Sequence, residues 1–325
     1  MKLRHWIITV VLGLLTTLSK AETKPNILII LADDVGYGDI PANYPEALVP
    51  MPHVERLAQQ GVRFLDAHTT SAVCAPTRYS VLSGNYPWRG RRPYGTWHFN
   101  GGSQFRQGQV PLPRQLKKAG YNTAMFGKVH LGAHVQPAEP GAPFNEDWTK
   151  DPALFDFAQP MVGGPKDLGF DYSFTSPAGI QDKPYAYFED DLMVGDPETF
   201  ITWKAGNYPN ENGFSKISKK HDGFGVPEWK SNQYAIDMMD KAVAFLERHI
   251  EDNKAAGTER PFFMHYCTEA VHVPHSPPKQ FFGEAVLGET PSHHLDMLKE
   301  LDLITGQLIA KLEAEGLLEN TLIIF

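Results

Sequence analysis

The feature that most constrains the fold is an aliphatic run near the N-terminus. Residues 27–32 read Ile-Leu-Ile-Ile-Leu-Ala, with no polar residue at any alternate position. A strand with one solvated face alternates apolar and polar residues, whereas a strand covered on both faces of a parallel sheet is apolar throughout. The run therefore predicts a central strand of an α/β domain. The 325 residues of the chain are enough for one large domain of this class.

Two adjacent carboxylates, Asp33 and Asp34, end this strand, and Gly36 and Gly38 follow them. In open α/β sheets, ligands collect at the carboxyl ends of the strands. Neighbouring carboxylates repel each other unless a cation lies between them, and hard cations prefer oxygen ligands. We therefore interpret the pair as candidate metal ligands. The alternative interpretation is a strand exit with two solvated acids.

A second candidate site is the stretch Cys-Ala-Pro-Thr-Arg at residues 74–78. The residues after it predict the first turns of a helix that ends at Gly84. A helix N-terminus favours negative charge, and Arg78 would lie one turn on from Cys74, on the same face. The pattern thus predicts a nucleophile beside a permanently charged anion binder. A buried cysteine at a loop–helix junction is the alternative interpretation.

Lys128 and His130 lie where a strand predicted to begin at Tyr121 emerges into a loop. Because they are two residues apart, their side chains would point to the same side. An ammonium and an imidazole at a strand end suit the binding of an anionic oxygen and a proton relay. The alternative interpretation is an ordinary surface pair.

Two more histidines, His272 and His275, lie in a proline-bounded loop after a strand predicted over residues 261–266. Two histidines in a rigid loop at a strand exit are unusual for packing alone. We therefore take both as candidate site residues.

The rest of the chain alternates helical and strand patterns, as an α/β domain requires. We predict helices over residues 53–60, 110–119, 231–250 and 291–315, and further strands over residues 62–65 and 320–325. Residues 133–230 are rich in Gly, Pro, Asn, Asp and aromatic residues, which predicts functional loops.

An arginine cluster follows the helix that begins near residue 78. Arg89, Arg91 and Arg92 could line a site for an anionic sugar, although a solvated basic loop is the favoured interpretation.

Taken together, these motifs resemble the signatures of the type I, formylglycine-dependent sulfatases of the alkaline-phosphatase superfamily. The N-terminal run that ends in Asp33 and Asp34 is similar to the family's metal motif. Cys-x-Pro-x-Arg at residues 74–78 is similar to its nucleophile motif. The motifs occur in the family's order, and the resemblance is closest to arylsulfatase-like and N-acetylgalactosamine-6-sulfatase-like members.

Two later motifs extend the resemblance. Residues 127–132, Gly-Lys-Val-His-Leu-Gly, differ from most members, which have Trp at the position of Val129. Residues 270–274, Ala-Val-His-Val-Pro, resemble the family's histidine loop and make His272 an active-site residue. His275 would then be a neighbouring substrate contact.

The resemblance implies both a fold and a reaction. The fold would be a large mixed, mostly parallel sheet flanked by helices. The reaction would be hydrolysis of a sulfate ester, on a sulfated carbohydrate. Cys74 would be converted to formylglycine (3-oxoalanine) by a formylglycine-generating or sulfatase-maturating enzyme, and its hydrate would be the nucleophile. One Ca²⁺ ion would be held by Asp33, Asp34 and residue 74.

The resemblance also assigns roles to the remaining polar residues. Arg78 and Lys128 would steady the nucleophile and the sulfate oxygens, so Lys128 is also a substrate-binding residue. His272 would contact the substrate and protonate the leaving oxygen, and His130 would accept a proton when sulfate is expelled. A phosphodiesterase or phosphatase of the same superfamily, and a non-catalytic binding fragment, remain the alternatives.

In the family, a second pair of metal ligands, a sulfate-binding lysine and a smaller C-terminal domain follow the last predicted strand. We therefore expect residues 22–325 to be a C-terminally truncated catalytic domain that by itself has little activity.

Composition and the first residues indicate where the protein acts. A net charge of −8 argues against a nucleic-acid partner, because phosphate binding needs a basic face. Residues 1–21 resemble a secretory signal with cleavage after Ala21, and an uncleaved anchor is the alternative. No other stretch predicts a membrane helix. We expect a periplasmic or secreted protein.

The chain has two cysteines, Cys74 and Cys267. In an oxidising compartment they could form a disulfide, and this pairing would exclude the sulfatase interpretation. Cys267 lies in an apolar run and is more simply interpreted as a buried strand residue.

Overall fold

The computed structural model describes residues 24–97, 99–144, 151–204, 206–210, 213–217 and 222–325. The segment expected to be a signal, residues 1–21, lies outside the described residues. Among the residues that the structure describes, no helix combines the length and apolar character needed to cross a bilayer.

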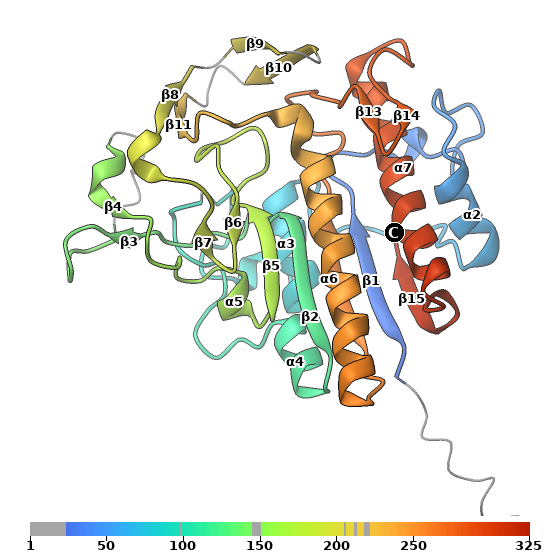
Figure 1. Cartoon of the computed structure of the whole chain (residues 1–325), viewed down its shortest axis with the longest axis horizontal. Coiled ribbons are helices and arrows are strands. Elements are labelled where there is room, and N and C mark those ends of the chain that lie inside the picture. Colours follow the sequence, from blue (N-terminus) through green and yellow to red (C-terminus); the bar gives the residue numbers. More distant parts are fainter. Residues whose placement is uncertain (1–23, 98, 145–150, 205, 211–212, 218–221) are drawn as a thin grey trace, which may run out of the picture.

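A seven-stranded sheet forms the centre of the molecule (Figure 1). Its strand order is β15-β1-β12-β2-β5-β6-β7. The first five strands in this order are parallel, and β6 and β7 extend the sheet in antiparallel fashion. The strands of this sheet are β1 Asn26–Leu31, β2 Asn122–Lys128, β5 Tyr172–Ser176, β6 Phe188–Glu189, β7 Leu192–Met193, β12 Phe262–Cys267 and β15 Thr321–Ile324. The expected mostly parallel α/β sheet is therefore confirmed.

The apolar strands are covered on both faces, as the sequence predicts. Along β1, Leu28 and Ile30 contribute to one hydrophobic cluster, while Ile29 contributes to another on the opposite face. In β12, Met264 and Phe263 divide between the same two clusters. Because side chains of a strand alternate between faces, an uninterrupted apolar run is required wherever helices cover both sides.

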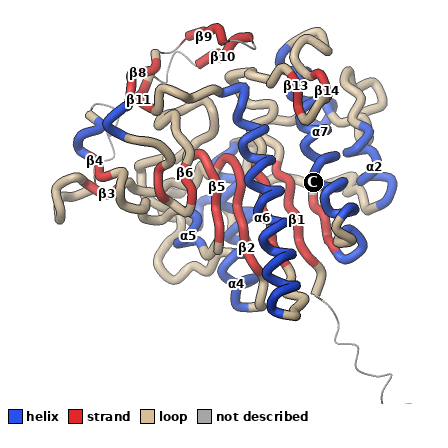
Figure 2. Tube along the Cα trace, in the orientation of Figure 1, coloured by secondary structure: helices blue, strands red, loops and turns tan. Residues whose placement is uncertain are grey.

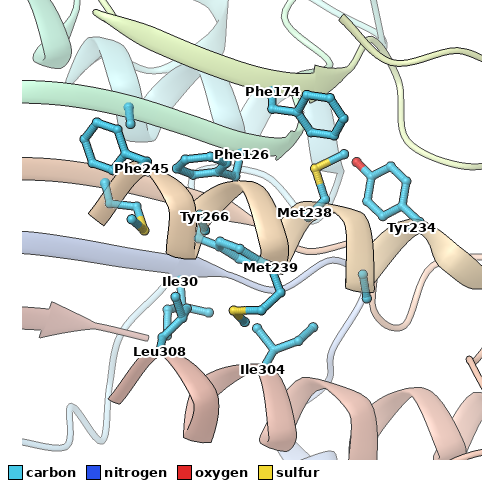
Figure 3. Packing of buried hydrophobic residues seen from close by; sticks show 14 of the residues in the cluster. Ile30, Phe126, Phe174, Tyr234, Met238, Met239, Phe245, Tyr266, Ile304 and Leu308 are labelled. Carbon is cyan, nitrogen blue, oxygen red and sulfur yellow. The ribbon is translucent and has the colours of Figure 1, made fainter. Parts of the chain in front are cut away.

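Helices form the two outer layers (Figure 2). The helices are α2 Pro52–Gln60, α3 Cys74–Ser83, α4 Leu112–Lys118, α5 Pro165–Leu168, α6 Tyr234–Ala256 and α7 His293–Ala314. α6 and α7 pack on one face, where Met239 of α6 lies among Tyr266 of β12 and Ile304 and Leu308 of α7 (Figure 3). α3 packs on the other face through Tyr79.

The long segment between β2 and α6 contains mostly short strands and turns, which agrees with the expected loop region. Its two-residue and longer strands outside the main sheet are β3 Gln136–Pro137, β4 Phe155–Asp156, β8 Ile201–Trp203, β9 Gly206–Asn210, β10 Gly213–Ile217 and β11 Gly223–Gly225. One further hairpin, β13 Gln280–Phe281 with β14 Glu284–Ala285, follows β12.

Several element boundaries differ from the predicted ones. The strand predicted over residues 62–65 is wrong: these residues form no strand and are exposed. They have no neighbouring strand to pair with, and an unpaired strand is not stable. α3 begins at Cys74 itself, so the signature residues are helical rather than a preceding loop. α6 extends to Ala256, where Gly257 ends it in a left-handed conformation.

Candidate active site

The candidate residues meet at the carboxyl edge of the parallel sheet. Asp33 follows β1, Lys128 ends β2, and His272 lies in the loop after β12. Cys74 and Arg78 come from the first turn of α3, on the face of the sheet opposite α6. The edge where strand ends and a helix N-terminus converge is therefore the site that the sequence predicts.

A buried charge cluster forms the base of the site. Lys128 Nζ donates to Asp33 Oδ2 at 2.5 Å, and Arg78 Nη2 lies 3.4 Å from Asp33 Oδ1. Arg78 Nη1 also donates to the backbone oxygen of Lys128 at 2.9 Å. All three side chains are at most 3% exposed. Two cationic groups therefore share one carboxylate in a region that water does not reach.

The electrostatics of Asp33 follow from this arrangement. Burial by itself raises the pKa of Asp33, but the charges of Arg78 and Lys128 outweigh burial and lower that pKa to about 2. The carboxylate is thus ionised at any physiological pH. Because the two cations formally carry one charge more than the carboxylate, the cluster favours a further anion nearby.

Cys74 and His130 lie in contact beside this cluster. The distance from Cys74 Sγ to His130 Nδ1 is 3.3 Å. Burial, followed by the charges of Lys128 and Arg78, holds the pKa of His130 well below its usual value. His130 is therefore neutral at neutral pH and can accept a proton from a group at position 74. Its backbone has a positive φ of 49°, so the chain turns sharply after β2 to place the ring there.

The loop that carries His272 is fixed to the end of β1. Asp33 N donates to the oxygen of Ala270 at 2.8 Å, and Val271 N donates to the oxygen of Asp33 at 2.5 Å. His272 Nδ1 lies 2.6 Å from the oxygen of Val273, and its Nε2 lies 3.7 Å from Asp34 Oδ2. The structure therefore brings His272 together with the predicted metal ligands.

His275 is placed differently. Its Nε2 lies 3.4 Å from Nδ1 of His294, the second residue of α7, and the two rings are perpendicular. Burial, then the charge of His294, lowers the pKa of His275. His275 thus pairs with α7 rather than with the buried cluster.

Sequence reasoning missed one titratable residue close to the site. Glu269 is the second residue after the sheet strand β12 and is 4% exposed. Burial, with the nearby charge of Asp33, raises the pKa of Glu269 to about 8. The signal was present in the sequence, because an acid two residues beyond a buried strand at the ligand-binding edge is a site candidate.

Asp33 and Asp34 have the oxygen donors that a hard cation prefers, although both oxygens of Asp33 face Lys128 and Arg78. Asp34 has a side chain that is 57% exposed, and its positive φ of 64° turns it away from the strand direction. Asp33 is ionised, so the two residues offer adjacent carboxylate oxygens of the kind that Ca²⁺ prefers. Ca²⁺ takes six to eight oxygens. Within the described ranges, no group of three or more His, Cys, Asp or Glu side chains is arranged to hold a metal.

Both cysteines are free thiols, and Cys267 is fully buried in β12. The disulfide alternative is therefore not realised in the structure.

Comparison with known proteins assigns this fold and site to a class. The mostly parallel sheet is shared with a solved sulfatase structure of the alkaline-phosphatase-like fold. A family model described as Sulfatase matches residues 25–325, and the chain belongs to the sulfatase family.

Individual relatives agree with this assignment. The chain is 32% identical over 326 residues to an N-acetylgalactosamine-6-O-sulfatase of Bacteroides thetaiotaomicron, covering 93% of this chain and 58% of the relative. It is 29% identical to arylsulfatase G of Rattus norvegicus, covering 93% of this chain and 50% of the relative. A solved structure from work on the metabolism of multiple glycosaminoglycans by Bacteroides thetaiotaomicron is 30% identical, with a TM-score of 0.69, covering 92% of this chain and 61% of the solved one.

The chain spans 58% and 50% of the lengths of these two curated relatives.

Proposed function

We propose that the protein hydrolyses sulfate monoesters on a glycan, with the chemistry centred on residue 74. The observation that carries this proposal is the buried cluster of Asp33, Arg78 and Lys128, whose excess positive charge lies beside the Cys74–His130 contact. An anionic ester needs such fixed positive charge, since preorganised charges in a dry site stabilise a developing anion. The name of one curated relative, an N-acetylgalactosamine-6-O-sulfatase, supports a sulfated sugar as substrate.

We propose that Cys74 is converted to formylglycine by a maturation enzyme. Formylglycine would supply, as its hydrate, one hydroxyl to attack sulfur and a second from which a proton is later removed. Arg78 is one turn along α3, and Lys128 lies next to it, so both can orient oxygens at residue 74. Neutral His130 would accept the proton, and its contact with residue 74 supports this role.

Asp33 and Asp34 would hold a Ca²⁺ ion together with an oxygen of residue 74. The ion would supply positive charge that lowers the pKa of a bound hydroxyl and offsets the charge of the sulfate group. His272, whose ring lies beside Asp34, would protonate the leaving oxygen and contact the substrate. Burial, followed by the charge of Lys128, lowers the pKa of His272. A general acid with a lowered pKa acts best at acidic pH.

We further propose that residues 22–325 belong to a single catalytic domain and that residues 1–21 are a cleaved export signal. N-terminal sequencing of protein recovered from the producing cell tests the second proposal. A mature N-terminus at Glu22 supports it, and a retained Met1 contradicts it.

The decisive experiment is mass spectrometry of the tryptic peptide Phe64–Arg78, from protein expressed with a formylglycine-generating enzyme. Conversion of the thiol to an aldehyde is expected at Cys74. Sulfate release from a 6-sulfated N-acetylgalactosamine substrate, weak in this chain by itself, should then accompany the conversion and be lost in Lys128→Ala, while the exposed-residue control Lys118→Ala keeps it. An unmodified thiol with full sulfate release, or a preference for phosphodiesters, would overturn the proposal.

A further inference from the structure

Two large aromatic side chains lie exposed and stacked just beyond the end of α3. Tyr86 is 52% exposed and Trp88 is 55% exposed. Their ring centroids are 4.3 Å apart and the ring planes differ by 8°. A single exposed aromatic residue needs no explanation, whereas neighbouring exposed rings form a patch of the kind that marks an interaction site.

The turn that presents these rings is held rigidly. Arg89 N donates to the oxygen of Tyr86 at 3.0 Å, and Gly90 N donates to the oxygen of Pro87 at 2.9 Å. Pro87 is buried, and Arg106 Nε donates to the oxygen of Gly90 at 2.8 Å. A surface that is already ordered loses little conformational entropy when a ligand binds.

Close packing beneath the turn also keeps the turn rigid. A Cβ atom added to Gly90 would lie 2.2 Å from Nε2 of Gln104. The Gln104 side chain in turn donates to the oxygen of Arg92 and accepts from its backbone N–H. The turn therefore has one well-defined place on the protein surface.

The charge beside the rings is positive, in a chain whose net charge is −8. Arg89 follows Trp88 directly in the sequence and is exposed. The neighbouring Arg91 serves the fold instead, because its Nε donates to the oxygen of Ser103 at 2.9 Å. A guanidinium group binds tetrahedral oxyanions through paired N–H donors.

We propose that Tyr86, Trp88 and Arg89, here called the aromatic platform, bind a chain of sulfated glycan outside the catalytic centre. The C–H groups of a sugar ring pack against the electron-rich face of an aromatic ring, and a sulfate group on the sugar pairs with Arg89. The glycan class rests on the proposed function, but binding at the platform needs no chemistry at residue 74. An acidic protein partner is the competing occupant, and it lacks sugar rings to stack.

The platform is separate from the catalytic residue. Cys74 begins α3, whereas the platform follows its C-terminal end. The ten residues of α3 span about 15 Å at the usual helical rise. The platform would hold a polymeric substrate on the protein without touching the ester that is cleaved.

The test is a binding titration of the protein with chondroitin sulfate. The protein carries the substitution Cys74→Ala, which prevents cleavage of the glycan. The double variant Tyr86→Ala/Trp88→Ala is expected to bind the chains about tenfold more weakly, and Arg89→Ala several-fold more weakly with a smaller salt dependence. The ring-preserving variant Tyr86→Phe/Trp88→Phe should retain most of the affinity. Phe64→Ala removes an even more exposed aromatic ring elsewhere and should have no effect.

Two further ligands separate the platform from the catalytic centre. Chemically desulfated chondroitin should bind weakly to every form, and N-acetylgalactosamine 6-sulfate alone should bind the wild-type chain and the double variant equally. Unchanged chondroitin sulfate binding by the double alanine variant, equal binding of the desulfated chains, or binding of an acidic protein but not of the glycan would each overturn the proposal. Absence of ester hydrolysis would contradict the proposed function and leave these binding results standing.

Discussion

At the scale of single residues, Asp33 holds two buried cations in place. Asp33→Asn keeps the shape of the side chain but leaves Lys128 and Arg78 without a counter-charge. Breaking a buried ion pair by removing one partner typically costs about 3–5 kcal/mol. We expect the free energy of unfolding to fall by about that amount, as measured by urea denaturation. The exposed neighbour is the control, and Asp34→Asn should change stability by less than about 1 kcal/mol. Equal stability of the two variants would show that the cluster does not stabilise the fold.

The same carboxylate contributes a pH dependence on the acid side. Its folded pKa of about 2 lies below its ordinary 3.8, so its stabilising effect is complete above about pH 4 and is lost as pH falls toward 2. The difference is worth about 2 kcal/mol. Denaturation curves from pH 5 to pH 2 should show this loss in the wild-type chain, and the Asp33→Asn variant should lack that share of it.

Glu269 should have the opposite pH dependence, between about pH 5 and pH 8. Burial raises its folded pKa to about 8 from an ordinary 4.5. The folded chain therefore keeps the proton more tightly, and stability is lost as pH rises from about 5 toward 8. Glu269→Gln cannot ionise, and should remove a loss on the order of 3 kcal/mol over that range. Parallel stability profiles of the variant and the wild type would contradict this assignment.

The two cysteines should differ sharply in reactivity. Burial raises the pKa of the Cys267 thiol to about 11, whereas Cys74 is only half-buried. In protein that retains the thiol at position 74, a thiol reagent should label one cysteine in the native chain and a second only after unfolding. Cys74→Ala should abolish native labelling, and Cys267→Ala should leave it intact. Labelling of Cys267 in the folded chain would show that β12 opens readily.

The sequence identified these residues by type and spacing but not by partner. Lys128 and His130 were predicted to lie on one side of a strand end, and both are in the site. That Asp33 would be bound by Lys128 and Arg78 was not predictable, because it depends on where α3 sits against the sheet. The contact of His275 with His294 was equally hidden, since the two residues come from a loop and a helix that only the tertiary fold brings together.

At the scale of elements, the close approach of β2 to β12 depends on one glycine. Gly127 has a φ of 89°, and a Cβ there would lie 1.8 Å from the backbone oxygen of Cys267. Gly127→Ala must therefore shift one of the two strands that carry the site. We expect a loss of about 3 kcal/mol or more in thermal or urea unfolding. Gly84→Ala is the matched control: it also has a positive φ, but an open surrounding, and should cost about 1 kcal/mol.

Element type was predictable wherever the pattern was long, and the boundaries were less so. The 23 residues of α6 and the 22 of α7 show sustained apolar stripes, and both helices exist close to their predicted places. The strand prediction over residues 62–65 was wrong because a short apolar segment forms a stable strand only if a partner strand lies alongside. Local sequence does not contain that information.

At the scale of the whole molecule, the two helical layers explain why the sequence predicts the fold class correctly. A strand buried on both faces is mostly apolar, and residues 27–31 of β1, 262–264 of β12 and 124–126 of β2 follow this rule between α6 and α3. The order of the strands could not be predicted from the sequence, because it depends on which face of the sheet each connecting helix packs against. The arrangement of the loops between β2 and α6 depends on non-local packing and was hidden for the same reason.

The edge of the sheet has a consequence for the colloidal behaviour of this chain. Among the residues that the structure describes, β15 pairs with β1 alone, Leu322 is 51% exposed and lines an open groove of about 730 Å³, and Ile324 is 45% exposed. An edge strand presents backbone N–H and C=O groups and apolar side chains with which another copy of the protein can associate. The apparent molar mass from light scattering should therefore rise with protein concentration, and Leu322→Lys should suppress the rise. An apparent molar mass that is independent of concentration would contradict this prediction.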